Sequence, residues 1–251
     1  MVNPLLFLVL LATLVFAAPP SSVGSRRGHR PSQRVTGGDA HNHSSPVEYS
    51  NNWSGAVWGS HPTGSFTSVT GTFKLPFPRS PDGAMSAWVG IDGDRSCPNT
   101  ILQTGVDIYY NNTHVSYAAW YEWYPAHAVY LTHFPLGAGD NIRLTVTAYS
   151  ATTGMAIVEN LTNGQKVSQN ISSSSPLCRQ NAEWVVEDFY SNGVLVPVCN
   201  FGTVAFTDAS ATSISGPDMS PNGATIFIMQ QKGRVLTSVS ENSSGVTISY
   251  Q

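Results

Sequence analysis

A chain of 251 residues in which only 11% are charged is long enough for one substantial domain, and its formal net charge of −3 gives no basic excess. Loss of residues 1–46 would remove four arginines and one acid and lower the net charge to −6. An acidic body repels a phosphate backbone, so the charge balance argues against nucleic acid as a partner.

The first element along the chain is an apolar run, residues 5–18, which ends in small residues before Pro19 and Pro20. The run is too short to span a bilayer, so we interpret residues 1–18 as a secretory signal peptide, with a membrane anchor as the alternative. We therefore expect a secreted, extracellular protein without a membrane partner.

Residues 19–46 form a basic segment that contains almost no large apolar side chain. Such a segment cannot bury enough surface to fold alone, so we interpret it as a propeptide or a disordered arm. Its arginines are Arg26, Arg27, Arg30 and Arg34. The adjacent pair Arg26 and Arg27 suits cleavage by a dibasic processing protease.

The remainder, residues 47–251, consists of short β-type runs separated by Gly, Asn, Asp, Pro and Ser, without a convincing helical period. The clearest runs are 65–76, 84–91, 100–110, 115–124, 141–149, 155–161, 203–211, 224–230 and 245–250. This pattern predicts one all-β domain, either a sandwich or a barrel.

Three of these runs have one face that mixes aromatic and polar side chains, because alternate residues of a strand point to opposite sides. The three faces are Trp88, Gly90 and Asp92; Gln103, Gly105 and Asp107; and Trp120, Glu122 and Tyr124. A single polar face would merely be solvated. Three of them together predict a binding groove on a curved sheet.

The stretch "NAEWVVEDF", residues 181–189, is typical of a buried strand but carries Glu183 and Glu187 on one side. The rise of a strand separates these two residues by about 13 Å, too far for both to act on one scissile bond. Either acid could face the groove, or could cap or pair with an arginine at the sheet edge.

Four arginines in an arm that precedes such an acidic groove predict that the arm binds across it and inhibits the protein near neutral pH.

An aromatic and acidic groove is compatible with two kinds of chemistry. Sugar binding or glycoside hydrolysis uses stacked aromatic rings and two carboxylates, whereas peptide hydrolysis can use one acid as general base and a donor to the oxyanion. The GxSxG, HExxH and CxxC patterns and the Asp-Thr-Gly or Asp-Ser-Gly of pepsin-like enzymes do not occur. The residues alone leave both kinds open.

Cysteines and glycosylation sequons fit an exported protein. Three cysteines, Cys97, Cys178 and Cys199, predict one disulfide and one buried thiol. The sequons begin at Asn42, Asn52, Asn111, Asn160, Asn170 and Asn242.

Six blocks of the sequence together resemble the glutamic peptidase family, the eqolisins, and follow one another in order over essentially the whole of residues 47–251. They are "NNWSGAVWGS" (51–60), "AWVGIDGD" (87–94), "TILQTGVD" (100–107), "YAAWYEWYP" (117–125), "VENLTNGQKVS" (158–168) and "LCRQNAEWVVEDF" (177–189). The resemblance implies a two-sheet antiparallel β-sandwich of the concanavalin A-like kind. It also implies a monomeric, pepstatin-insensitive acid endopeptidase that hydrolyses proteins or peptides and needs no metal or cofactor.

The same resemblance assigns individual residues by motif. Gln103 and Glu187 match the catalytic glutamine and glutamate, and Cys97 and Cys178 match a disulfide. The residues that match the lining of the cleft are Trp53, Trp88, Asp92, Glu122 and Tyr124. The alternative is a carbohydrate-binding or glycoside-hydrolysing sandwich of the same architecture. Its ExDxxE signature is not met, because Val185 occupies the Asp position.

Overall fold

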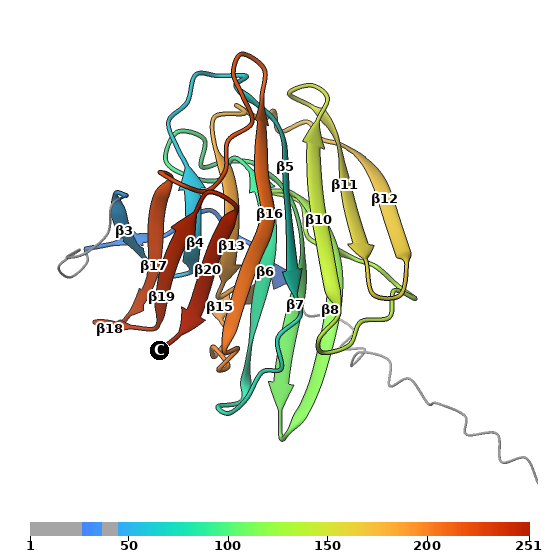
Figure 1. Ribbon diagram of the computed structural model, residues 1–251, viewed down its shortest axis with the longest axis vertical. Helices are drawn as coiled ribbons and strands as arrows, with labels where there is room; N and C mark the ends of the chain where they lie inside the picture. Colours follow the sequence, from blue (N-terminus) through green and yellow to red (C-terminus); the bar gives the residue numbers. More distant parts are fainter. Residues whose placement is uncertain (1–26, 37–44) are drawn as a thin grey trace, which may run out of the picture.

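The computed structural model describes residues 27–36 and 45–251, so the predicted signal peptide at 1–18 lies outside the described residues. All the regular structure within these two ranges is β-strand. Two large sheets pack face to face, and β10, β11 and β12 form one end of the smaller sheet (Figure 1). None of the described residues belongs to a helix that could cross a membrane. The predicted all-β antiparallel sandwich is confirmed.

The strands fall into three sheets, and every pair is antiparallel except β3 with β17. The seven-stranded sheet has the order β12 (Gln165–Ser172), β11 (Thr153–Asn160), β10 (Asn141–Ala148), β5 (Phe66–Lys74), β16 (Thr203–Ser213), β20 (Gly245–Tyr250), β19 (Thr237–Asn242). The larger sheet has the order β2 (Arg34–Val35), β3 (Val47–Ser50), β17 (Thr225–Gln231), β4 (Trp53–Trp58), β13 (Ala182–Glu187), β6 (Gly83–Ile91), β7 (Ile101–Asn111), β8 (His114–Tyr124), β9 (Val129–Tyr130), and β18 (Arg234–Val235) pairs with β17. A small sheet consists of β1 (Arg27–Gly28), β14 (Tyr190–Ser191) and β15 (Val194–Leu195).

The main core lies between the two large sheets and follows from alternation along the strands. In β10 every second residue, beginning with Ile142, is buried, while the residues between are more exposed. Trp184 of β13 packs into the same core, and its indole Nε1 donates to the carbonyl of Thr70 at 2.7 Å. Burial of apolar area at about 25 cal/mol per Å² is the dominant contribution of this layer to stability.

The polar strand β12 departs from the sequence analysis, which had no strand at residues 165–172. Most of its side chains are exposed, so its hydrophobic pattern gives no signal. It forms because its backbone pairs with β11 over eight residues. β12 is thus an edge strand that is held by pairing and not by burial.

The larger sheet is buried on both faces, which is unusual for a sandwich with one main core. The outer face of β4, β6, β7, β8, β13 and β17 carries a second apolar cluster: Trp53, Val57, Trp88, Ile101, Trp120, Val185 and Phe227. Gly105 lies between two of these rings, and a Cβ there would approach Trp88 Cβ at 2.6 Å and Trp120 Cζ2 at 2.7 Å. Only glycine leaves room for this pair of indoles.

Residues 27–36 cover this outer face. At one end β1 pairs with β14, and at the other end β2 pairs with β3. Between them Ser32 N donates to Gly93 O at 3.1 Å, and Asn51 N donates to Gln33 O at 2.6 Å. The composition of this segment cannot support a core of its own. It is therefore ordered by backbone pairing with residues 45–251, here called the body.

A disulfide joins Cys97 to Cys178, the pair implied by the resemblance, and Cys199 is a buried free thiol. The bridge closes a loop with a sequence separation of 81, which corresponds to roughly 4 to 5 kcal/mol in the chain-entropy treatment. Peptide mapping without reduction is expected to recover Cys97 linked to Cys178, and Cys199 alkylated only after unfolding. A covalent dimer through Cys199, or a bridge from Cys199 to either partner, would contradict this assignment.

Candidate active site

Glu187 ends β13 and lies fully buried beneath the segment 27–36. Its Oε2 accepts a hydrogen bond from Trp88 Nε1 at 2.9 Å and lies 3.0 Å from His29 Nδ1. Its Oε1 accepts from the backbone N–H of Arg30 at 3.0 Å. Burial raises the pKa of Glu187 above its ordinary value, while the charge and hydrogen bond of His29 act in the opposite direction.

His29 is the side chain that fills the site. Its ring stacks on Trp120 with centroids 3.7 Å apart, and its Nε2 lies 3.5 Å from Asp107 Oδ1. Burial alone lowers the pKa of His29, but the charges of Asp107 and Glu187 outweigh it and raise the pKa to about 9. His29 is therefore an imidazolium at neutral and acid pH, held between two carboxylates.

The backbone that follows His29 is fixed by the body. Trp53 Nε1 donates to the carbonyl of Arg30 at 2.9 Å, and Asn52 Nδ2 donates to the carbonyl of Pro31 at 3.2 Å. Asn52 Oδ1 in turn accepts from Gln33 N at 2.8 Å. These contacts hold the peptide bond between His29 and Arg30 beside the carboxylate of Glu187. Residues 27–36 thus occupy the outer face as an extended peptide would.

Gln103 lies on the same outer face, fully buried on β7. Its Nε2 donates to Glu122 Oε2 at 2.7 Å, and its Oε1 has no hydrogen-bond partner among the described residues. Burial raises the pKa of Glu122 to about 8, and the charge of Glu187 adds to the shift. Glu122 is therefore neutral in acid and can orient the Gln103 amide. The described contacts include no direct hydrogen bond between Gln103 and Glu187.

Glu183 occupies a different environment from Glu187. By strand register it lies opposite Gly90, which itself lies opposite Gln103. Its two carboxyl oxygens have no hydrogen-bond partner within the described residues. Burial raises the pKa of Glu183 well above its ordinary value, and the charges of Asp92 and Asp94 act in the same direction. Burial thus favours the protonated form of Glu183, whereas Glu187 contacts the bound segment.

Asp92, which the resemblance assigned to the cleft lining, is bonded to the chain around residue 180. Its carboxylate accepts backbone hydrogen bonds from Arg179 at 2.7 Å and from Gln180 at 2.8 Å. Asp92 also brings an oxygen within 4.8 Å of the sulfurs of Cys97 and Cys178, as in a metal site. Both sulfurs belong to the disulfide, and the Asp92 carboxylate accepts backbone hydrogen bonds. We therefore assign these three residues a structural role and not a metal site.

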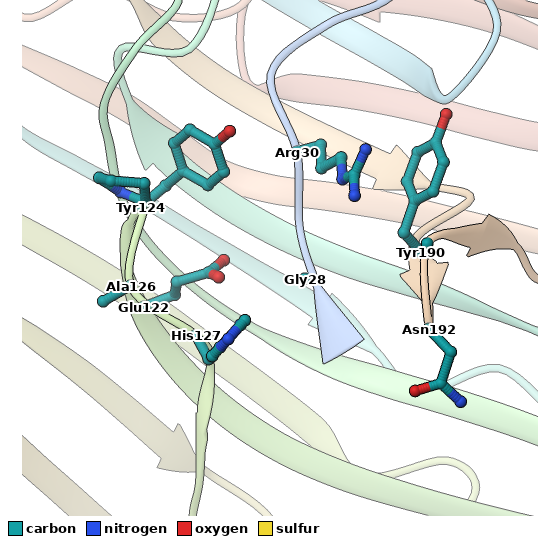
Figure 2. Close-up of a pocket in the computed structure, with 10 residues that line it drawn as sticks. Gly28, Arg30, Glu122, Tyr124, Ala126, His127, Tyr190 and Asn192 are labelled. Carbon is teal, nitrogen blue, oxygen red and sulfur yellow. The ribbon is translucent and has the colours of Figure 1, made fainter. Parts of the chain in front are cut away.

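An open cavity of about 650 Å³ remains beside the bound segment. Figure 2 shows Gly28 and Arg30 between two walls, with Tyr124 and His127 on one side and Tyr190 on the other. Its full lining is Gly28, Arg30, Glu122, Tyr124, Pro125, Ala126, His127, Tyr190, Asn192 and Gly193. The Arg30 guanidinium lies over the Tyr190 ring at 4.2 Å. Tyr124, a cleft-lining candidate, is thus one of the residues around this cavity.

Three residues at the centre of the site were not among the candidate site residues: His29, Asp107 and Trp120. Alternation had placed Asp107 beside Gln103, and Trp120 beside Glu122, on the groove faces, so a signal existed for both. Asp107 Oδ2 accepts from Tyr109 Oη at 2.7 Å and from Tyr130 Oη at 2.6 Å, which orients it toward His29. For His29 only the basic character of the segment gave an indication.

The fold and site define the class as a peptide-binding β-sandwich with an acid-rich cleft, because an extended stretch of polypeptide lies along its outer face. The sequence pattern described as the peptidase A4 family matches residues 51–250, and the chain belongs to this family, the glutamic peptidases or eqolisins. The protein is a glutamic endopeptidase.

Named relatives and solved structures agree with this assignment. The chain is 42% identical to aspergillopepsin-2 of Aspergillus niger over 226 residues, covering 81% of this chain and 78% of that protein. It is 40% identical to scytalidopepsin B of Scytalidium lignicola over 258 residues, covering 95% and 94%. A crystal structure of scytalido-glutamic peptidase with a transition-state-analogue inhibitor has 40% identity and a TM-score of 0.72, covering 80% of this chain and 98% of that one. The aspergilloglutamic peptidase of Aspergillus niger has 47% identity and a TM-score of 0.64, covering 67% and 99%.

Proposed function

We propose that the protein is a secreted acid endopeptidase in which Glu187 and Gln103 carry out peptide hydrolysis, and that residues 27–36 inhibit it until they are displaced. The observation that carries the proposal is the contact between Glu187 Oε1 and the backbone nitrogen of Arg30, at 3.0 Å. In a substrate the equivalent nitrogen would belong to the leaving amine. Trp88 Nε1 holds the other carboxylate oxygen.

In the proposed reaction Glu187, as carboxylate, removes a proton from a water that attacks the scissile carbonyl carbon. The Gln103 amide has two N–H donors. One is bonded to Glu122 and fixes the amide plane, and the second donates to the oxyanion that develops. Glu187 then delivers its proton to the leaving nitrogen as the C–N bond breaks.

The bound segment blocks this reaction although it presents a peptide bond to Glu187. The His29 ring bonds Glu187 Oε2 at 3.0 Å and stacks on Trp120, so it fills the space beside the carboxylate that an attacking water would need. Burial raises the pKa of Glu187, whereas His29 and the Arg30 N–H of the segment lower it, so the proposed inhibition rests on the filled space. Displacement of residues 27–36 would admit water to the carboxylate.

Hydrolysis of denatured protein at about pH 3, with and without pepstatin, tests the class of chemistry against the carbohydrate alternative. We expect cleavage that pepstatin does not inhibit, because that inhibitor fits paired aspartates and none are proposed here. A β-glucan incubated in parallel should remain intact. Glucan hydrolysis without proteolysis would favour the glycosidase interpretation instead.

The Gln103→Ala variant tests the oxyanion donor. We expect kcat to fall by roughly 10² to 10³, the loss typical of one oxyanion-hole donor, while the sandwich stays folded. Gln169→Ala on the exposed strand β12 is the matched control and should behave as wild type. Steady-state kinetics on one peptide, with circular dichroism of each variant, provide the measurement. A folded Gln103→Ala enzyme with unchanged kcat would remove Gln103 from the mechanism.

A further inference from the structure

We propose that Asp94 and Glu48 form a specificity subsite for a guanidinium group that lies five residues after the scissile bond of a substrate. This proposal rests on the proposed function and extends it to the choice of substrate. It predicts that the enzyme favours peptides with arginine at this distant position. The subsite is occupied in the structure by the protein's own Arg34.

The contacts of Arg34 show the chemistry of the subsite. Its Nη2 donates to Asp94 Oδ2 at 2.6 Å and its Nε to Asp94 Oδ1 at 3.3 Å, a two-point contact that matches a planar guanidinium to a carboxylate. Its Nη1 forms an ion pair with Glu48. The guanidinium carbon also lies 4.7 Å from the centroid of the Phe227 ring, within the range of a cation–π interaction.

The subsite belongs to the body and not to the bound segment. Asp94 lies in a tight loop in which Gly93 N donates to Cys97 O at 2.9 Å and Cys97 N donates to Asp94 O at 2.8 Å, next to the disulfide. With Arg34 in place the side chain of Asp94 is 4% exposed, and its Oδ1 also accepts a hydrogen bond from Ser32 Oγ at 2.7 Å. Glu48, on β3, is 31% exposed and is also reached by the exposed Arg95 at 3.2 Å. Asp94 is therefore the main determinant, and Glu48 the accessory one.

The register follows from the main chain of the bound segment. The nitrogen of Arg30 contacts Glu187, so Arg30 occupies the first position after the bond that faces the base. Ser32 and Gln33 then bond to Gly93 and Asn51 through their backbones, contacts that any extended peptide can make. A substrate that follows this track in the same direction places its fifth residue after the scissile bond beside Asp94.

Two sets of peptides test the subsite, identical except for arginine, citrulline or alanine at the fifth residue after the single cleavable bond. Citrulline keeps the shape of arginine and removes its charge. With the full-length protein after acid incubation, we expect kcat/KM for the arginine peptide to exceed that for citrulline about tenfold, or about 1.4 kcal/mol. The second set carries a reduced, non-cleavable bond, and calorimetry should give the same ratio of affinities.

The variants assign the effect to the two acids. Asp94→Asn should bring the ratio of arginine to citrulline close to one, and Glu48→Gln should lower the ratio by a smaller factor. Asp218→Asn removes an exposed carboxylate elsewhere and should leave both the ratio and the rate on the alanine peptide unchanged. Mass spectrometry of the products checks that the cleaved bond stays the same.

The outcomes separate this proposal from the proposed function. The subsite would be overturned if the arginine and citrulline peptides had equal kcat/KM in the first set and equal affinity in the second, even if every peptide is cleaved. A preference for arginine placed before the bond, and not after it, would also overturn it, because substrates would then run opposite to residues 27–36. Failure to cleave any peptide would instead reject the endopeptidase mechanism, and the calorimetric ratio would still decide the subsite.

Discussion

The Glu187→Gln variant is expected to remain folded but to hydrolyse peptides at least 10² to 10⁴ times more slowly than wild type, roughly the contribution of a general base. The amide oxygen can still accept the hydrogen bond from Trp88, so the local packing should survive. An amide cannot take a proton from water or return it to the leaving nitrogen. The loss should therefore appear in kcat, with KM little changed.

Glu183→Gln is the matched control on the same face of the same strand. Because the pKa of Glu183 is raised well above its ordinary value, this side chain is neutral at the assay pH, and an amide reproduces its shape and charge. The charges that act on its pKa are those of Asp92 and Asp94, and no hydrogen bond joins it to residues 27–36. We expect this variant to keep most of its activity.

The measurement is digestion of a denatured protein and of one defined peptide at about pH 3, by purified wild type and both variants, with circular dichroism as the check on folding. The assignment of Glu187 as the base would be wrong if a folded Glu187→Gln enzyme cleaved at the wild-type rate. A loss confined to Glu183→Gln would indicate that the acid in register with Gln103 is the base instead.

The second large effect concerns the arm. A synthetic peptide of residues 19–46 should inhibit the enzyme from which this arm has been removed, here called the processed enzyme. The inhibition should be strong at pH 6 and weak at pH 3. Replacement of His29 by glutamine in this peptide should cost about 2 to 5 kcal/mol of binding at pH 6, because it removes one partner of a buried, hydrogen-bonded charge pair. Two basic side chains of the arm have carboxylate partners in residues 45–251. His29 contacts Glu187 and Asp107, and Arg34 contacts Asp94 and Glu48.

The direction of the pH dependence follows from these groups. The pKa of His29 is raised to about 9, so its contribution to binding is complete below about 6.5 and is lost as the pH rises through 9. On the acid side, we expect the attraction between the basic arm and the acidic cleft to weaken as the negative charge of the cleft falls. The raised pKa of Glu187 alone would favour the complex in acid, because burial penalises the ionised form; we expect the loss of the other ion pairs to exceed this effect.

Calorimetric titration of the processed enzyme at pH 3, 6 and 9.5 measures the effect without depending on turnover. Affinity should be highest at pH 6 and lower at both ends. A peptide with Gln33→Ala retains every arginine and His29 and serves as a control for the ionic contribution. Equal affinity at pH 3 and pH 6 would exclude release by acid, and an unchanged affinity of the His29→Gln peptide would exclude His29 as the central contact.

Much of the architecture and several site positions were predictable from local patterns. Alternation in β6, β7 and β8 separated core positions such as Val89 and Val106 from groove positions such as Trp88 and Asp107, because the two faces of a strand meet different surroundings. The resemblance of six sequence blocks added the family. In contrast β12 had no sequence signal, since its polar side chains are exposed and only backbone pairing holds it.

The sequence by itself determined the strand alternation, the cysteine inventory and the two glutamates on one face of β13. Only the tertiary structure decided which glutamate contacts residues 27–36, because their positions in register with β6 give Glu187 and Glu183 different partners. Only the tertiary structure also brought His29, 158 residues away in sequence, to Glu187. Local sequence cannot encode such a contact: it forms when charge attraction and burial on the folded sheet together exceed the entropy of ordering the arm.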